Sequence, residues 1–319
     1  MRFFIFLIIF IFSSNIFFGQ TFADDQRFKK NENWKKYISK TKSKLSKEAG
    51  SAFEYYRFEG FAPANDFNYI KQDIEKKYKI AKYEYVKIKT KDKLKLDGWF
   101  IPVENAKGTI IVLHGYSSDM SFGLSQSKFL LEKGYQILVY NARFWQYSKK
   151  PEKFVFSITK EISDVGDVLD YVKTRKDVDP TKIGIFGFSQ GGFKTYLSAA
   201  KYSDFKVVMV DAGPANRYWF DSNPDILKAI KDKTGEDPTA EEFDVLAQVE
   251  KISPRPLLIL HGGKDSFVPT FVSESIFEKA KDPKEFKIFE NSNHCLGMMQ
   301  SDKESYINTV SEFLDKYLK

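Results

Sequence analysis

A serine between two glycines is the position in this chain best suited to do chemistry. Residues 183–195 read IGIFGFSQGGFKT, in which a run of β-formers stops at Ser189 and a helix-compatible stretch follows. The spacing Gly-x-Ser-x-Gly is typical of a sharp strand-to-helix turn, because Gly187 and Gly191 lack the bulk that would hold the two elements apart. Such a turn lifts the serine hydroxyl above the carboxyl edge of the sheet, where ligands of open α/β sheets bind.

A serine hydroxyl is a poor nucleophile unless a base removes its proton, and a carboxylate must fix the tautomer of that base. The chain has three histidines. His294 lies in the loop ENSNHCLG downstream of the serine and is predicted to be the base. His114 and His261 stand in His-Gly pairs at the ends of two expected strands, so we interpret both as structural.

The acid has two candidates, each close to the end of an expected strand. Asp265 lies in LHGGKDSFVP, in a loop where its carboxylate can meet an imidazole carried by another loop. Asp211 ends the preceding strand, in VVMVDAG, and is the rival. Asp265 is preferred because it gives the chain order serine, aspartate, histidine that accompanies this serine motif.

Two backbone N–H groups are expected to face the serine and to stabilise a tetrahedral oxyanion. One belongs to Gln190, directly after the serine. The other belongs to Tyr116 in LHGYSSD, where Gly115 lets the loop turn tightly. Cys295, beside the predicted base, has no base or turn of its own and is interpreted as a small packing residue.

The elements that position these residues alternate regularly after residue 83. Residues 83–90 and 94–102 predict an antiparallel hairpin, and six further apolar runs alternate with helical stretches. The predicted strands among them are 108–115, 135–141, 182–188, 205–212, 255–262 and 285–291, and the helices are 122–134, 159–174, one after Gly191, one from about 270 and one ending at 318. Buried strands that alternate with helices predict a mostly parallel sheet with helices on both faces.

The motifs LHGYSSD, GFSQGG, HGGKDSFVP and NSNHC, in this order, resemble the α/β-hydrolase superfamily. The opening IKTKDKLKLDGWFIP is similar to the serine-aminopeptidase-like and dienelactone-hydrolase-like branches, and to S9 and S33 peptidases. The resemblance covers about residues 83–319. It implies an α/β-hydrolase fold with an eight-stranded sheet whose second strand is antiparallel, and an enzyme that needs no cofactor.

The resemblance also implies a small helical lid after the sixth strand, here residues 214–251. The residues that it suggests for a substrate pocket are aromatic: Phe188, Tyr218, Trp219 and Phe220. After VYNAR the family often has a Gly-rich turn, whereas this chain has FWQYSKKPEKFVF, an aromatic and basic loop that is expected to change the rim of the pocket.

The first 23 residues predict an exported protein. Arg2 is followed by an apolar run from residue 3 to residue 12, and Thr21-x-Ala23 is an acceptable cleavage site. Ten apolar residues suit a signal peptide and are short for a bilayer span. An uncleaved anchor over residues 3–18 is the alternative. Residues 24–82 are expected to form a helical extension whose Lys-rich part, 27–53, either packs on the domain or lies on a membrane surface.

Composition excludes several other classes of protein. The formal charge is +7 without a basic patch interleaved with aromatics, so nucleic acid is not expected as a partner. A single cysteine rules out an intramolecular disulfide, and three widely spaced histidines give no metal-binding cluster. Nothing in the sequence predicts an oligomeric state.

The sequence therefore predicts an exported serine hydrolase that acts on carboxylic esters, with thioesters and short peptides as further candidate substrates and a small acyl compound as its partner. An acyltransferase with the same three residues is the nearest alternative, because an alcohol or amine can replace water. A non-catalytic binding protein on the same fold is the other alternative, although a binding protein has no need of a complete triad.

Overall fold

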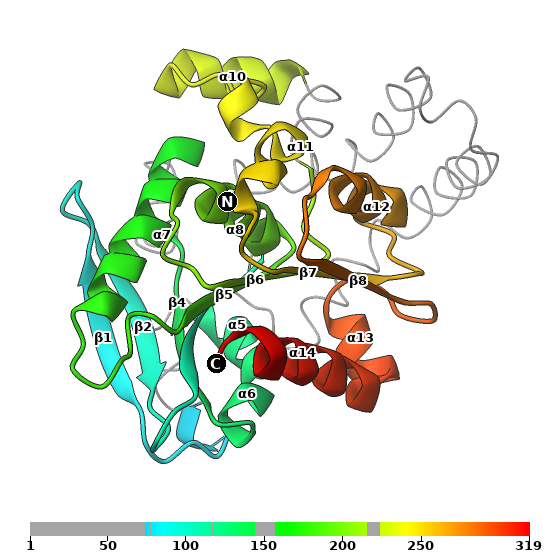
Figure 1. The fold of residues 1–319 in the computed structure, drawn as a ribbon. Coiled ribbons are helices and arrows are strands. Elements are labelled where there is room, and N and C mark those ends of the chain that lie inside the picture. Colours follow the sequence, from blue (N-terminus) through cyan, green and yellow to red (C-terminus); the bar gives the residue numbers. More distant parts are fainter. Residues whose placement is uncertain (1–73, 77, 116–117, 144–156, 216–223) are drawn as a thin grey trace. The chain divides into compact units, whose positions relative to one another are not determined.

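The computed structural model describes residues 74–76, 78–115, 118–143, 157–215 and 224–319. An eight-stranded sheet in the order β1-β2-β4-β3-β5-β6-β7-β8 runs through the larger part (Figure 1). Strand β2 is antiparallel to β1 and β4, whereas the pairings from β4 through β3, β5, β6 and β7 to β8 are all parallel. The predicted mostly parallel sheet with an antiparallel second strand is confirmed.

The strands match the predicted apolar runs closely. They are β1 (Glu84–Lys89), β2 (Lys95–Ile101), β3 (Gly108–Leu113), β4 (Tyr135–Tyr140), β5 (Ile183–Phe188), β6 (Val207–Asp211), β7 (Leu257–Gly262) and β8 (Lys284–Phe289). Every residue of β3, β4, β5, β6 and β7 is buried. Continuous burial is the reason that these strands read as unbroken apolar runs rather than as alternating patterns.

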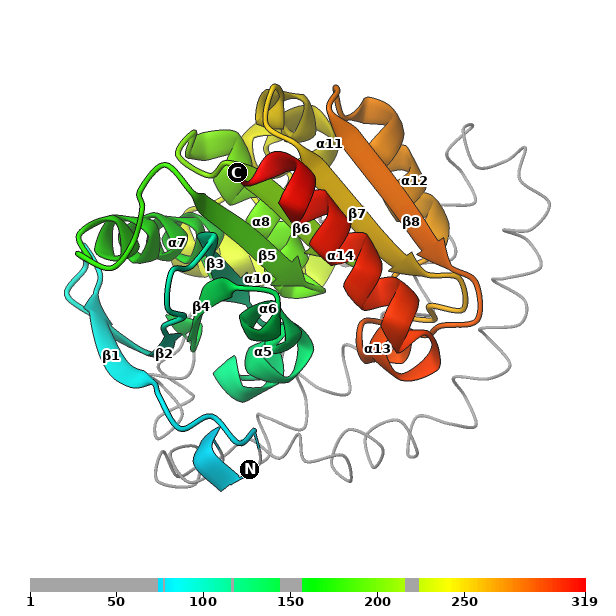
Figure 2. The ribbon, with the colours of Figure 1, turned by 60° about the horizontal axis from the view of Figure 1, so that its bottom comes forward.

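Helices cover both faces of the sheet (Figure 1). One face carries α7 (Ile158–Lys173), α8 (Gln190–Lys201), α11 (Val245–Gln248) and α12 (Thr270–Lys279); the other carries α5 (Met120–Ser127), α6 (Phe129–Glu132), α13 (Leu296–Ser301) and α14 (Lys303–Tyr317). In Figure 2, α14 crosses in front of the sheet near β6 and β7, and α12 lies behind β8. The helix predicted over 122–134 is in fact two helices, α5 and α6, which meet at Lys128.

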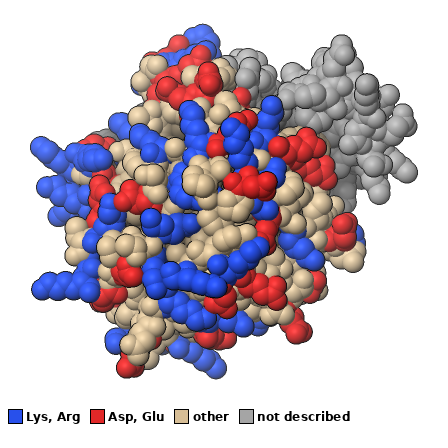
Figure 3. Space-filling view, in the orientation of Figure 1, with Lys and Arg blue, Asp and Glu red and all other residues tan. Residues whose placement is uncertain are grey.

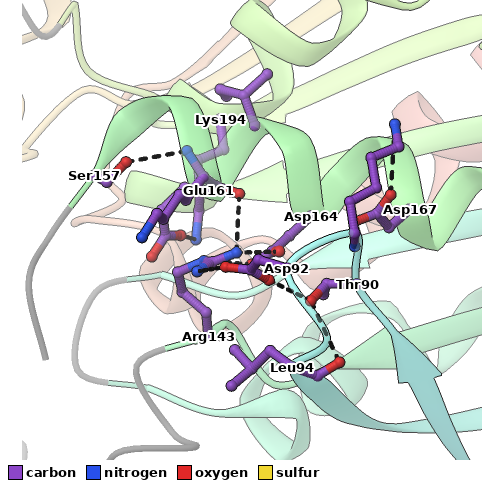
Figure 4. A network of polar contacts seen from close by, with 12 residues as sticks. Thr90, Asp92, Leu94, Arg143, Ser157, Glu161, Asp164, Asp167 and Lys194 are labelled. Carbon is purple, nitrogen blue, oxygen red and sulfur yellow. Dashed lines mark hydrogen bonds and ion pairs between the residues drawn. The ribbon is translucent and has the colours of Figure 1, made fainter. Parts of the chain in front are cut away.

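A polar network fixes α7 to its neighbours (Figure 4). Arg143, just after β4, donates two hydrogen bonds of 2.6 and 2.8 Å to Asp164 and one of 3.0 Å to Asp92 in the β1–β2 turn. Lys194 of α8 lies 2.9 Å from Glu161 of α7, and both side chains are about 5% exposed. The three carboxylates therefore face cations, which is the condition under which buried charge is tolerated.

The chain divides into two units by its internal contacts: residues 63–215 with 241–319, and residues 1–62 with 216–240. In the second unit the structure describes α10 (Pro224–Thr234) and the turn that follows it. Lys231 lies 2.8 Å from Asp237 there. The predicted signal or anchor, nearly all of the N-terminal extension and part of the predicted lid lie outside the described residues.

The described surface carries both signs of charge. On the face in Figure 3, Lys and Arg side chains are interspersed with Asp and Glu. Among the described residues, no helix combines the length and the apolar character that a membrane span requires.

Candidate active site

Ser189 stands at the junction of β5 and α8, in a backbone conformation that few side chains adopt. Its φ of 52° and ψ of −118° lie outside the helical and extended regions, and a non-glycine residue at positive φ is strained. The Ser189 N–H donates to the Asp211 carbonyl on β6 at 2.9 Å, which anchors the turn to the neighbouring strand. The residue itself is half-buried.

The two glycines of the motif are required by the tightness of this turn. A Cβ at Gly187 would overlap the Thr195 side chain and the Gly191 carbonyl of α8. A Cβ at Gly191 would overlap the Leu113 carbonyl at the end of β3. The sequence pattern thus reflects backbone pressed against backbone on both sides of the serine.

The predicted base and acid are in direct contact. Nδ1 of His294, in the β8–α13 loop, lies 2.6 Å from Oδ2 of Asp265 in the β7–α12 loop. The other oxygen of Asp265 accepts the N–H groups of Phe267 at 2.8 Å and Val268 at 2.9 Å. Because these donors hold the carboxylate, His294 carries its proton on Nδ1 and presents Nε2 as the basic nitrogen.

Electrostatics strengthens this pair. Burial alone lowers the pKa of His294, but the charge and hydrogen bond of Asp265 outweigh burial, so the pKa is raised. Burial likewise raises the pKa of Asp265, while His294 and the neighbouring donors bring it below the ordinary value. The Phe267 ring lies against the imidazole, with ring centroids 5.3 Å apart.

Asp211, the rival acid, lies in a different place. Its side chain is fully buried, and Oδ2 accepts a hydrogen bond of 2.8 Å from the Tyr306 hydroxyl of α14. Burial is the main cause that raises the pKa of Asp211 to about 7. The pairing with His294 belongs to Asp265, as the sequence order predicts.

The other two histidines are fully engaged inside the fold. Nε2 of His114 accepts the Ala142 N–H at 3.0 Å, and Nδ1 lies 2.8 Å from the Gly115 carbonyl. Burial lowers the pKa of His114 to about 3. His261 bridges Ser273 at 2.7 Å and the Val268 carbonyl at 2.8 Å, and burial lowers its pKa too. Both contacts are those of structural histidines.

The predicted oxyanion donors are described in part. Gln190 is the first residue of α8, so its N–H is one of those that find no partner within the helix. Tyr116 lies outside the described residues, but the preceding Gly115 is next to the serine: a Cβ added to it would stand 3.3 Å from the Ser189 Cβ. Gly115, which precedes the predicted second donor, therefore lies beside Ser189.

The predicted pocket residues are also described only in part. Phe188 is fully buried and packs against Phe186, with ring centroids 4.5 Å apart, and against Phe122 at 6.0 Å. Residues 218–220 lie outside the described residues. A substrate pocket that includes these four aromatics stays a prediction.

The Asp211 carbonyl connects the serine to the histidine loop. It accepts the Ser189 N–H and, at 3.7 Å, the Sγ–H of Cys295, the residue after His294. No hydrogen bond joins the Ser189 hydroxyl to His294 in the described part of the chain. Catalytic hydrogen bonds are often long before substrate binds, so this is compatible with a shared site.

Tyr306 is the residue of this region that the sequence did not reveal. It belongs to an apolar stripe of α14 and is indistinguishable there from a core aromatic; its partner Asp211 is 95 residues away in the chain. Among the described residues, no group of three or more His, Cys, Asp or Glu side chains is arranged to hold a metal ion.

Comparison with known proteins decides the family. The model of the prolyl oligopeptidase family matches residues 155–319, more than half of the chain. The chain belongs to the prolyl oligopeptidase family. Ser189, Asp265 and His294 all lie within the matched residues.

Relatives and solved structures with a similar fold cover most of the chain. The uncharacterized protein YfhR of Escherichia coli (strain K12) is 26% identical over 242 residues, which cover 72% of this chain and 80% of that protein. The Pyrococcus furiosus esterase Pf2001 has a TM-score of 0.60 at 24% identity and covers 77% of this chain and 96% of its own. A dienelactone hydrolase from Anabaena variabilis has a TM-score of 0.58 at 18% identity, covering 75% and 99%. The predicted α/β-hydrolase superfamily is confirmed.

Proposed function

We propose that this chain is a serine hydrolase that cleaves carboxylic esters, and also thioesters or short peptides, through a covalent acyl-enzyme. The observation that carries the proposal is the 2.6 Å contact between His294 and Asp265, in loops at the same sheet edge as the turn of Ser189. Membership in the prolyl oligopeptidase family supports hydrolysis as the reaction class.

In the proposed first step, the Ser189 hydroxyl attacks the acyl carbon and gives its proton to Nε2 of His294. Asp265 holds the imidazole by Nδ1 and stabilises its positive charge without taking the proton itself. The tetrahedral intermediate then collapses, and the leaving alcohol, thiol or amine takes the proton from His294. The acyl group remains on the serine oxygen.

In the second step a water molecule replaces the leaving group. His294 takes a proton from the water as its oxygen bonds to the acyl carbon, and returns this proton to the Ser189 oxygen as the carboxylic acid departs. In both steps the N–H groups of Gln190 and Tyr116 receive the negative oxygen. Loss of one such donor typically lowers the rate by about 100- to 1000-fold.

The substrate side of the proposal rests on the chain after β6. We propose that the part of residues 214–251 that precedes α11 forms a lid and that Tyr218, Trp219 and Phe220 contact the acyl group, together with Phe188. Aromatic side chains favour an apolar acyl chain, because their large faces remove apolar surface from water.

Esters of graded acyl length test this function directly. Purified full-length protein is assayed with p-nitrophenyl esters from acetate to decanoate, with the matching thioesters, and with aminoacyl p-nitroanilides. Turnover of at least one ester, lost in Ser189→Ala, is the expected result. Turnover that survives in Ser189→Ala would remove the serine from the mechanism, and product formed only with an added alcohol would favour acyl transfer.

We also propose that the protein is exported, with residues 1–23 removed as a signal peptide. The apolar run over residues 3–12 supports this, and the polar triplet at 13–15 argues against a membrane span, since a single helix cannot supply partners for those side chains in hydrocarbon. N-terminal sequencing of protein from the native host checks it. A soluble form that begins near Asp24 is expected; intact residues 1–23 in the membrane fraction would identify an anchor.

A further inference from the structure

Asp211 is a buried carboxyl group that the proposed mechanism does not use. It ends β6, and its side chain turns toward α14, where the Tyr306 hydroxyl donates to Oδ2 at 2.8 Å. The second oxygen, Oδ1, has no hydrogen-bond partner among the described residues and is shielded from solvent. It is the only carboxylate oxygen of the described residues in this condition. Such an atom costs stability, so its retention calls for a reason.

The surroundings of Asp211 are held rigidly. The Tyr306 ring packs against Phe129 and Phe289, with ring centroids 6.1 and 5.7 Å apart, so the hydroxyl has little freedom. The backbone of Asp211 holds the candidate site as well: its carbonyl accepts the Ser189 N–H and the thiol of Cys295. The backbone of Asp211 therefore contacts both the turn of Ser189 and the loop that carries His294.

The groups that face Asp211 come from four elements. Tyr306 approaches from α14, His294 and Cys295 from the β8–α13 loop, Asp265 from the β7–α12 loop, and the Ser189 backbone from the β5–α8 turn. Of the side chains among them, His294 alone can carry a positive charge. Burial raises the pKa of the Cys295 thiol and of the Tyr306 hydroxyl, so both are neutral at physiological pH.

We propose that Asp211, oriented by Tyr306, is a positioning residue for His294: a second carboxyl group that stabilises positive charge on the imidazole without a hydrogen bond to it. This inference rests on the proposed function, in which His294 becomes charged in both steps. Asp265 then holds His294 by a hydrogen bond and fixes its tautomer. The negative charge of Asp211 adds an electrostatic attraction to the charged imidazole, which is strong because the surroundings have a low dielectric constant.

The sign of the expected effect follows from charge. An ionised Asp211 favours the charged form of His294 and so raises the pKa of the imidazole. Asp211→Asn keeps the shape but removes this charge, so the pKa of His294 should fall. Tyr306→Phe removes the hydrogen bond that favours the Asp211 carboxylate. A larger share of Asp211 is then neutral near pH 7, and the pKa of His294 should fall by a smaller amount.

The test is a histidine titration by NMR, which does not require turnover. The chain has three histidines, and His114 and His261 are buried with lowered pKa values, so the His294 signal is the one that titrates highest. Protein with labelled imidazole Cε1 is titrated as wild type, Asp211→Asn and Tyr306→Phe. The matched control is Tyr135→Phe, which removes another tyrosine hydrogen bond to α14, 3.0 Å to Asp315.

The expected result is a fall in the pKa of His294 by about half a unit or more in Asp211→Asn, a smaller fall in Tyr306→Phe and no change in Tyr135→Phe. If Asp211→Asn does not fold, Tyr306→Phe decides alone. An unchanged pKa of His294 in folded Tyr306→Phe and, where it folds, in Asp211→Asn would overturn the proposal. A wild-type protein without esterase turnover would contradict the proposed function instead, because the titration reports the coupling separately.

Discussion

Two groups of buried charges in this molecule differ in how completely they are paired. Around α7, Glu161 faces Lys194, and Asp164 receives two hydrogen bonds from Arg143 (Figure 4). At the β8–α13 loop, His294 pairs with Asp265 at 2.6 Å, and His261 lies 3.5 Å from the same Asp265 oxygen. One oxygen of Asp211 has no hydrogen-bond partner among the described residues.

This difference separates what stabilises the fold from what is available for chemistry. Around α7 each carboxylate has a cation as its direct partner, although burial raises the pKa of Asp164 to about 7. In the second group burial raises the pKa of Asp211 to about 7 and Asp265 raises the pKa of His294, but no cation of the described residues touches the Asp211 carboxyl group. Incomplete pairing is thus the feature by which the second group resembles an active site.

The largest expected effect comes from removing the acid of the second group. Asp265→Asn leaves the two backbone donors to this side chain in place but destroys the preference for the Nδ1–H tautomer of His294. We expect kcat for an ester to fall by about 10,000-fold with little loss of folded protein. Steady-state kinetics and circular dichroism check this. Asp211→Asn is the matched control, and a larger loss there than in Asp265→Asn would reverse the assignment of the acid.

Breaking an ion pair around α7 should instead lower the stability of the fold. Lys194→Met leaves Glu161 buried without its cation, and the free energy of unfolding should fall by about 3–5 kcal/mol. Urea denaturation measures this. The double variant Lys194→Met/Glu161→Leu should recover much of the loss, since a buried ion pair can be replaced by apolar residues. A double variant as unstable as Lys194→Met would mean that the pair itself, rather than the orphaned charge, supports the fold.

The pH profile of activity sharpens the comparison further. His294 must be neutral to act as a base, and its pKa lies above the ordinary value of 6.5. The acidic limb of kcat/KM should therefore have its midpoint above pH 6.5 and move to lower pH in Asp265→Asn, where the cause of the increase is removed. The matching stability contribution of His294 is present at low pH and is lost as the pH rises through its folded pKa. An acidic limb that stays in place in Asp265→Asn would contradict this assignment.

The smallest expected effect comes from a substitution of Asp92, the exposed member of the polar network around α7. Asp92 accepts a hydrogen bond from Arg143, but its side chain is 42% exposed, whereas that of Asp164 is 3% exposed. Asp92→Asn should change the free energy of unfolding by less than about 1 kcal/mol, as for surface pairs. Thermal denaturation of Asp92→Asn and Asp164→Asn side by side checks the ranking, and equal losses would show that exposure does not govern these pairs.

Much of the fold could be predicted because its strands are buried on both faces. An unbroken apolar run such as 182–188 indicates a strand without knowledge of its neighbours, and β5 spans Ile183–Phe188. The break between α5 and α6 could not be predicted, because neither glycine nor proline marks Lys128. The sequence around the break gives no signal, because it contains no residue with a special backbone preference.

The candidate site shows the same limit. The glycines around Ser189 and the chain order of Asp265 and His294 carry local signals, and the structure brings the latter two together. Tyr306 carries none, since its role depends on the hydroxyl meeting a strand end far away in the chain. A hydrogen bond of this kind leaves no spacing in the sequence to detect.

The most direct test of the account is the reaction of Ser189 with a fluorophosphonate, which phosphonylates only a serine activated by a neighbouring base. Trypsin releases residues 183–194 as one peptide whose only hydroxyl side chain is Ser189, so mass spectrometry locates the adduct without ambiguity. The account predicts one adduct on this peptide in folded wild type, and none in Ser189→Ala or in protein unfolded before labelling. An unlabelled 183–194 peptide in folded wild type, or undiminished labelling of Ser189→Ala, would contradict it.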